Sequence, residues 1–153
     1  MSGRTFEKFE LIQRVLAHGR FVLHGSNLDD LRWIEPRPAT GYGQGHRPSG
    51  VYATEDVASA IFYAVVDRKR VRWFTANRGV FLIEPVQGAA AAWVPGAVYV
   101  LDRGDLDLVD GNLVSTAAVK AVGKVAVSVE DFPLLAEVRH QTREAWLAER
   151  GAR

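Results

Sequence analysis

The second half of the chain is built from short β-forming segments, and this pattern restricts the possible folds more than any other feature of the sequence. From residue 79 onward, brief runs rich in Val and Leu alternate with Gly, Pro or Asp. Such runs predict antiparallel strands joined by tight connections, because turn residues end each strand before a helical period can develop. We therefore expect a β-meander made of the segments GVFLIEP, AVYVLD, DLDLVD, NLVST and KVAVSVE.

Helical patterns lie on both sides of a strand near the N-terminus. Residues 1–19 are expected to contain a helix, because their apolar residues fall near one face, Thr5 can cap its start and Gly19 can end it. Residues 20–24 (RFVLH) have the composition of a short strand. Residues 28–34 (LDDLRWI) again carry apolar residues at roughly helical spacing.

A second strand and helix follow a loop rich in Gly and Pro at residues 36–50. The strand is VYAT, and Thr54 is expected to cap the helix after it. A further helix is expected at 131–150, with Asp131 as its cap. The helix after Thr54 has apolar residues at the i, i+3, i+4, i+7 and i+8 positions typical of a core-facing stripe. These residues are Val57, Ala60, Ile61, Ala64 and Val65.

Together these patterns predict a single α+β domain over residues 1–153. With a net charge of +1, the chain lacks the basic excess of a general nucleic-acid binder. It has no Cys, which excludes disulfides, thiolate nucleophiles and Cys-rich zinc sites and favours a reducing compartment. The start of the chain, MSGRTFEKFE, lacks the apolar core of a signal peptide, and no apolar run approaches the ~20 residues of a membrane span. We expect a cytoplasmic protein without a membrane partner.

Residues in the first half form the most specific motif of the sequence. One strand ends in His24-Gly25-Ser26, a second carries Gly-x-Tyr with Tyr52, and Tyr63 follows eleven residues later in the helix behind it. This arrangement resembles the ADP-ribosyltransferase superfamily, in particular its diphtheria-toxin and poly(ADP-ribose) polymerase branch. The resemblance implies a split β-sandwich of two small antiparallel sheets with flanking helices, and NAD as the substrate.

The residue types suit the recognition of nicotinamide. A flat ring can be held between two tyrosines, here Tyr52 and Tyr63. Gly25 lacks a Cβ, so its backbone can approach the carboxamide and supply both a donor and an acceptor. The resemblance further implies that Ser26 hydrogen-bonds the carboxamide and that His24 binds a ribose hydroxyl. These five residues are the predicted NAD site, and His24 and Tyr52 are also candidate catalytic residues.

The third element of the motif departs from the family. Most active members carry a glutamate at the start of a later strand, where Asn112 stands in this sequence. Asparagine can hydrogen-bond a ribose hydroxyl, but it has no charge to stabilise a developing cation. Losing such a group typically lowers the rate ~10²–10³-fold. Asp110 is the alternative if the strand register differs, and Glu84 is a more distant one. Asn112 and Asp110 complete the candidate catalytic residues.

The expected function is NAD-dependent mono-ADP-ribosyl transfer to an acceptor that is a protein, a nucleic acid or a small molecule. The alternative is a catalytically weak or inactive module of the same fold that binds NAD or ADP-ribose. A related NAD-using RNA 2′-phosphotransferase is a third interpretation, for which the required arginines and histidines cannot be placed. No metal is expected, because His46 has no Cys or second His nearby at ligand spacing.

The stretch RKRVRWF at 68–74 allows two interpretations. In the first, its basic residues are solvated and its aromatic ones, Trp73 and Phe74, pack in the core. In the second, it is an acceptor-side patch that binds phosphate or nucleic acid through charge and stacking. The near-zero net charge favours the first. The remaining tryptophans expected to be packing residues are Trp33, Trp93 and Trp146.

Overall fold

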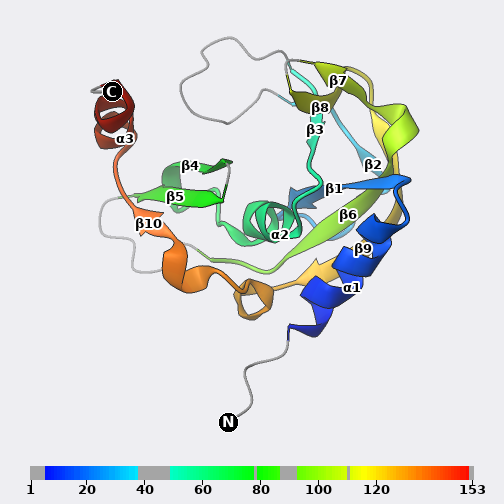
Figure 1. Cartoon of the computed structure of the whole chain (residues 1–153), viewed down its shortest axis with the longest axis horizontal. Helices are drawn as coiled ribbons and strands as arrows, with labels where there is room; N and C mark the ends of the chain where they lie inside the picture. The colour runs from blue at the N-terminus through cyan, green and yellow to red at the C-terminus, as the bar shows by residue number, and fades with distance from the viewer. Residues whose placement is uncertain (1–5, 38–48, 78, 87–92, 110, 152–153) are drawn as a thin grey trace.

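Figure 1 shows the computed structural model of the chain, in which helix α2 lies at the middle of several small sheets. The structure describes residues 6–37, 49–77, 79–86, 93–109 and 111–151. In chain order the helices and strands are α1 (Glu7–Ala17), β1 (Phe21–Ser26), β2 (Trp33–Ile34), β3 (Val51–Ala53), α2 (Val57–Val65), β4 (Val71–Asn77), β5 (Val80–Pro85), β6 (Gly96–Asp102), β7 (Asp107–Val109), β8 (Asn112–Ser115), β9 (Val119–Val127), β10 (Arg139–His140) and α3 (Arg143–Gly151). Short 3₁₀ helices lie at Arg103–Asp105, Val129–Asp131 and Leu135–Glu137.

The α+β class is confirmed, and the strands within these ranges form three sheets. The largest has the strand order β1-β6-β9-β2 and is antiparallel throughout. The second has the order β10-β5-β4, with β10 parallel to β5, and the third has the order β3-β8-β7. Hydrogen bonding therefore divides the strands among three sheets, where two had been expected.

The expected β-meander is wrong in its connections. β4 and β5 form a hairpin, as do β7 and β8, but β6 pairs with β1 and β9 instead of its sequence neighbours. β8 pairs with β3, the strand that carries Tyr52. Strand propensity is local, whereas pairing between distant strands depends on packing that a local pattern does not record. The consequence for the site is that β7 and β8 lie beside the first-half motif.

Helix α2 forms the centre of the core (Figure 1). Every residue of its predicted apolar stripe is buried, and Phe62, outside the centre of that stripe, is fully buried as well. The Phe62 ring packs against Phe74, Phe81 and Phe132 at centroid distances of 6.4, 5.1 and 5.8 Å. Because protein covers the helix on several sides, α2 serves as a fixed support for the residues along β1.

The helix caps differ in part from the sequence predictions. α1 ends two residues before Gly19, whose φ of +78° suits glycine, while Thr5 lies outside the described residues. α2 is capped by Asp56 instead of Thr54, since the Asp56 carboxylate accepts from the Ser59 N–H at 3.2 Å. The Thr54 hydroxyl accepts from the Asp56 N–H at 3.0 Å and so orders the turn before the cap.

The helix predicted at 28–34 is wrong, because only the two residues of β2 are regular there. The hydroxyl of buried Tyr99 donates to the Leu28 carbonyl at 2.6 Å and accepts from the Leu31 N–H at 3.0 Å. Both bonds tie this segment to β6 and use backbone groups that a helix would pair internally. Local helical spacing is therefore overridden by long-range contacts.

The helix predicted at 131–150 forms only in its last part, α3, and other elements replace its first part. Asp131 ends a 3₁₀ helix, Phe132 is extended with φ −92° and ψ 111°, and β10 precedes α3. Pro133 explains the break, because proline lacks an N–H and disfavours the helical region for the residue before it. Only Arg143–Gly151 is α-helical in this part of the chain.

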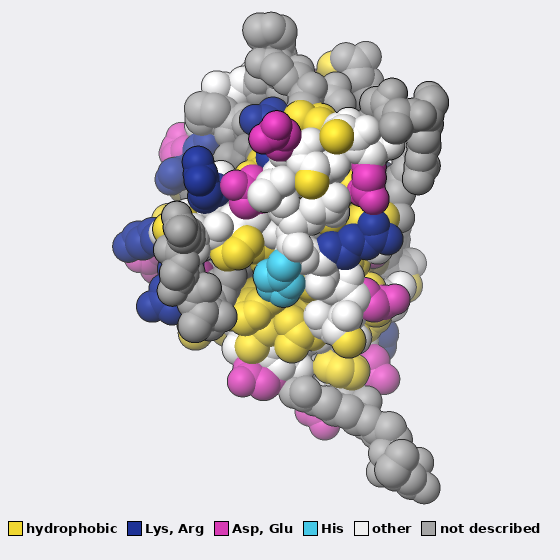
Figure 2. Space-filling view, turned by 90° about the vertical axis from the view of Figure 1, so that its left-hand side faces the viewer, with side chains coloured by type: hydrophobic (Ala, Val, Ile, Leu, Met, Phe, Trp, Pro, Cys, Tyr) yellow, Lys and Arg dark blue, Asp and Glu magenta, His cyan; other side chains and the backbone are white. Residues whose placement is uncertain are grey.

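The charged side chains on one face of the molecule (Figure 2) include both basic and acidic residues, in line with the net charge of +1. Figure 2 shows one face on which basic and acidic side chains are interspersed around a hydrophobic area, without a continuous basic field. In the part of the chain that the structure describes, no helix combines the length and the apolar character needed to cross a bilayer.

Candidate functional site

One large cleft, with a volume of about 1180 Å³, brings the predicted site residues together. It lies at the end of β1, between β3, β8 and the C-terminal part of α2. Such a concave surface with a few convergent polar groups is the usual form of a ligand site. The predicted residues that line it are His24, Gly25, Ser26, Tyr52, Tyr63 and Asn112.

The two remaining candidates do not join this set. Asp110 lies outside the described residues. Glu84 is not among the residues that line the cleft, and its carboxylate accepts from the Arg143 N–H at 2.7 Å and faces Arg72 at 3.7 Å. Glu84 therefore holds the start of α3 against β5, and no role in the cleft is assigned to it.

The cleft begins where β1 and β3 separate. Leu23 and Thr54 exchange two backbone hydrogen bonds of 2.9 and 2.8 Å across these strands. A continued antiparallel ladder would next pair Gly25 with Tyr52. Instead, the Tyr52 carbonyl accepts from His24 Nδ1 at 2.7 Å, and no backbone bond joins Gly25 to β3 among the described residues. The His24 imidazole thus donates to the carbonyl that would otherwise accept from the Gly25 N–H and continue the pairing of β1 with β3.

The separation leaves the Gly25 peptide groups facing the cleft. Backbone groups of consecutive residues in a strand point to opposite sides, so Gly25, two residues after Leu23, shares the direction of Leu23, away from β6. Since Leu23 uses that direction to reach β3, the Gly25 N–H and C=O point into the space between β1 and β3. One residue therefore presents a donor and an acceptor side by side at the cleft.

Gly25 is required by the packing of α2 against β1. A Cβ at this position would lie 2.1 Å from the Ala60 carbonyl oxygen and 2.8 Å from the Ala64 nitrogen of α2. The missing side chain lets α2 cross β1 closely, which places Tyr63 beside the strand. The sequence prediction assigned the small size of Gly25 to the approach of a ligand; the approach that the structure contains is that of α2.

His24 is held in one tautomer. Because a carbonyl only accepts, the bond to Tyr52 places the proton of the neutral ring on Nδ1 and leaves Nε2 as an acceptor. Burial lowers the pKa of His24 below its usual 6.5, and the positive charges of Arg68 and Arg37 lower it further, while the bond to the Tyr52 carbonyl opposes the shift. At neutral pH the ring is therefore uncharged and can accept a hydrogen bond from a hydroxyl group.

This lowered pKa predicts a pH-dependent stability. Below about pH 6.5 the unfolded chain binds a proton at His24 more readily than the folded protein, so the free energy of unfolding should fall as the pH drops from 7 to 5. Urea unfolding of the protein and of His24→Gln at both values measures the effect. The variant should lose less stability than the protein on acidification. His18→Gln, at an exposed position, is the control, and equal losses in all three proteins would contradict the prediction.

The two tyrosines enter the cleft from different elements, and both are half-buried. Tyr52 lies on β3, opposite Val114 of β8. Tyr63 lies near the end of α2, where its hydroxyl donates to the Ala76 carbonyl at 3.2 Å and accepts from the Ala76 N–H at 3.3 Å. Its ring meets the edge of Phe74 at a centroid distance of 5.9 Å. Tyr63 is thus fixed at both ring and hydroxyl, as a wall for a ligand requires.

Asn27 is a site residue that sequence reasoning missed. Its Nδ2 donates to the Ala64 and Val66 carbonyls, both at 2.8 Å, and its Oδ1 accepts from the Arg68 N–H at 3.3 Å. These bonds join the residue after β1 to the end of α2, at Ala64, and to Val66 and Arg68 just beyond it. The available signal was its position directly after His-Gly-Ser.

Most of the basic stretch 68–74 fits the interpretation in which its aromatic residues pack in the core and its basic residues do not form a binding patch. Trp73 and Phe74 are buried, and Arg70 and Arg72 face the carboxylates of Asp67 and Glu84 at 3.4 and 3.7 Å. Much of the stretch belongs to strand β4. Arg68 and Lys69 differ from the rest, because both line the cleft.

The cleft also has an apolar rim. Trp33, expected to be a packing residue, is 51% exposed at the cleft, and Leu108 is 73% exposed. Trp146 is buried and Trp93 packs against the core, as predicted. The exposed apolar groups lie where a bound molecule would cover them, so their exposure is consistent with a ligand larger than a single ring.

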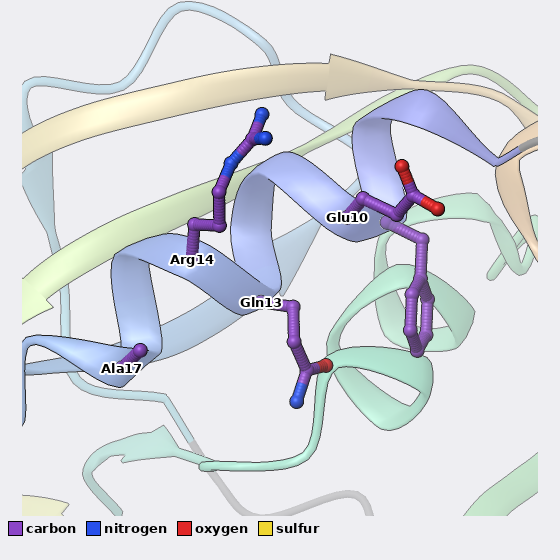
Figure 3. A pocket seen from close by; sticks show the side chains of 5 residues that line it. Glu10, Gln13, Arg14 and Ala17 are labelled. Carbon is purple, nitrogen blue, oxygen red and sulfur yellow. The ribbon is translucent and has the colours of Figure 1, made fainter.

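Two other possible sites are not supported. In the described ranges no cluster of three or more His, Cys, Asp or Glu residues could hold a metal, and His46 lies outside those ranges. A second hollow of about 380 Å³ is lined by side chains of α1 alone. Figure 3 shows Gln13 and Arg14 pointing away from each other there.

No protein-family model, curated protein or solved structure matches this chain. Its function is therefore inferred from the geometry and chemistry of the cleft.

Proposed function

We propose that the protein is an NAD-dependent mono-ADP-ribosyltransferase with a variant of the split β-sandwich of that superfamily. The observation that carries the proposal is the separation of β1 and β3, which turns the Gly25 peptide groups toward a cleft lined by His24, Tyr52 and Tyr63. A donor, an acceptor and two phenol rings in one cleft match the needs of a nicotinamide, which has a flat ring and a carboxamide.

In the proposed complex the nicotinamide ring lies between the Tyr52 and Tyr63 rings. The Gly25 N–H donates to the carboxamide oxygen, and the Gly25 carbonyl accepts from the carboxamide N–H. The Ser26 oxygen already accepts from the Leu28 N–H at 3.1 Å, which leaves its own hydrogen to donate. His24 Nε2 accepts from a ribose hydroxyl, as its neutral tautomer permits.

The reaction breaks the bond between the ribose C1′ and the nicotinamide nitrogen. The electron pair of that bond leaves with nicotinamide, so C1′ becomes an oxocarbenium-like centre, and the acceptor's nucleophilic atom then bonds to it and releases a proton. In the proposed complex Asn112, which begins β8 and lines the cleft, accepts a hydrogen bond from the ribose through its amide oxygen. An uncharged group stabilises this cation less than a carboxylate, so slow turnover is expected.

The identity of Asn112 also favours a second candidate, a module that binds NAD or ADP-ribose without turning it over. Three carboxylates line the cleft among the described residues, those of Glu35, Glu55 and Asp67. Glu55 is held by Arg103 through contacts of 2.8 and 3.1 Å, and Asp67 faces Arg70. Two of the three are thus engaged by an arginine. Such a module would keep the same pocket and the same contacts to the ring, but it would lack the charge that accelerates the reaction.

The proposal predicts that the protein releases nicotinamide from NAD and that the ring of Tyr52 is needed. Tyr52→Ala should weaken NAD binding about 10- to 100-fold, because stacking of a base on an aromatic side chain contributes ~1–3 kcal/mol. Tyr52→Phe keeps the ring and should bind nearly as the parent protein does. Nicotinamide release and calorimetric titration with NAD measure both effects. Absence of turnover and of binding at millimolar NAD would contradict the proposal.

A further inference from the structure

Arg68 is fixed in the cleft by several contacts, although it follows the last turn of α2. Its backbone N–H donates to Asn27 at 3.3 Å, and its guanidinium Nη2 donates to the Tyr63 carbonyl at 3.3 Å. The guanidinium carbon also lies 5.3 Å from the ring centroid of Phe74, a cation–π distance. The arginine is therefore oriented by the same elements that fix the predicted ring-binding tyrosine.

The charge of Arg68 has no carboxylate partner in the described part of the chain. The arginines that do pair there, Arg70, Arg72 and Arg103 among them, bind Asp67, Glu84 and Glu55. Glu35 also lines the cleft, but it forms no ion pair with Arg68 or Arg37 in the same ranges. Arg68 and Arg37 thus face the cleft together with Lys69, and within the described ranges neither arginine is paired with a carboxylate.

The electrostatics of the cleft agree with this description. The Arg68 side chain is open to solvent, yet enough protein surrounds it that desolvation lowers its pKa; Tyr63 opposes this shift, and Arg37 adds to it. Both arginines also lower the pKa of His24. Each arginine thus disfavours the charge of its neighbours, and a bound anion would relieve that repulsion.

We propose that Arg68 and Arg37 bind the diphosphate of the nucleotide, so that the preferred ligands of the cleft are dinucleotides and ADP-ribose. This inference rests on the proposed function, because it uses the position of the nicotinamide. In NAD a single ribose separates the ring from the diphosphate. With the ring at Tyr63 and the ribose at His24, the diphosphate reaches the two arginines. A guanidinium binds phosphate oxygens through paired N–H groups, which suits arginine to this role.

A nucleic-acid backbone is the less favoured source of phosphate. Binding along a polymer requires a run of basic contacts, whereas Arg70 and Arg72 are paired with carboxylates. The face in Figure 2 likewise carries both signs of charge. The arginines of the cleft therefore fit one small anion better than a polyanion.

The test is calorimetric titration of the full chain with ADP-ribose, nicotinamide and inorganic pyrophosphate. Arg68→Gln should weaken ADP-ribose and pyrophosphate binding about 10- to 100-fold and leave nicotinamide binding unchanged. Arg68→Lys should retain more of the affinity for both phosphate ligands than Arg68→Gln. Arg72→Gln removes the same charge from a residue that, like its partner Glu84, lies outside the cleft lining, and it should bind all three ligands like the parent protein. Thermal unfolding of each variant checks that it is folded.

The outcomes separate the two proposals. Unchanged ADP-ribose affinity in folded Arg68→Gln would overturn the diphosphate site and leave the proposed function standing. Pyrophosphate binding that depends on Arg68, without any nicotinamide binding, would support the anion site and contradict the proposed function. Tighter binding of a short single-stranded RNA than of ADP-ribose, lost in Arg68→Gln, would replace the dinucleotide with a nucleic acid.

Discussion

Gly25→Ala is expected to lower the stability of the protein by about 3 kcal/mol or more, and the Tm by roughly 6–12 °C. The added Cβ would lie 2.1 Å from the Ala60 carbonyl oxygen, which is far inside van der Waals contact. That oxygen belongs to the backbone of the buried helix α2, so it cannot turn aside as a side chain would. Relief requires α2 to move away from β1, and much of the core packs on α2.

Gly123→Ala is the matched control, because Gly123 also lies in a strand of the main sheet. A Cβ there would meet only the Val100 side chain, at 3.8 and 3.9 Å, which is an ordinary contact. Neither glycine has a positive φ, so alanine can adopt both backbone conformations. Gly123→Ala should stay within about 1 kcal/mol of the parent protein. Equal Tm values for Gly25→Ala and the parent protein, measured by calorimetry, would show that α2 does not need this close approach.

The Gly25 result also limits how the site can be probed. Since Gly25→Ala should displace α2 and with it Tyr63, a loss of NAD binding in that variant could not be assigned to the Gly25 peptide groups. The amide resonance of Gly25 in the unmodified protein provides a direct measurement. Addition of nicotinamide should shift it strongly, because the proposed complex gives that N–H a hydrogen-bond acceptor.

Local patterns predicted the elements of this fold better than their arrangement. The α2 stripe was confirmed because a period of 3.6 records which residues face a core. The segment at 28–34 had similar spacing, but the Tyr99 hydroxyl, 71 residues from Leu28 in sequence, holds it in another conformation. The pairing of β8 with β3 is likewise a long-range property. Short strands of similar composition carry no local signal of their partners.

The candidate site was predicted where it depends on residue type and missed where it depends on three-dimensional contacts. His24, Tyr52 and Tyr63 were selected by their resemblance to a family motif, and the cleft contains all three. The position of Arg68 in the cleft could not be read from the basic stretch, because only the folded protein shows that Arg70 and Arg72 pair with Asp67 and Glu84 while Arg68 does not. Sequence reasoning explained Gly25 by the approach of a ligand, whereas the structure explains it by the close approach of α2.

Asn112→Glu is expected to raise the rate of nicotinamide release about 10²–10³-fold, equivalent to about 3–4 kcal/mol of transition-state stabilisation. Asn112 begins β8, and the register of β8 with β3 places it in the same small sheet as Tyr52. A carboxylate at this point of the cleft would face the ribose on which positive charge develops. The position is half-buried at the end of a hairpin, so the longer side chain can be accommodated without disturbing the core.

Asn112→Gln separates charge from size in this experiment, because it adds the same methylene without a carboxylate. Under the proposed function Asn112→Glu accelerates nicotinamide release and Asn112→Gln does not, while both bind NAD about as tightly as the parent protein. If Asn112→Glu binds NAD and remains inert, the scaffold lacks more than one group of the catalytic site, and the protein is the binding module. If it neither binds nor reacts while the parent protein binds, Asn112 contacts the ligand in a way that a carboxylate disrupts, and the assigned position of the ribose is wrong.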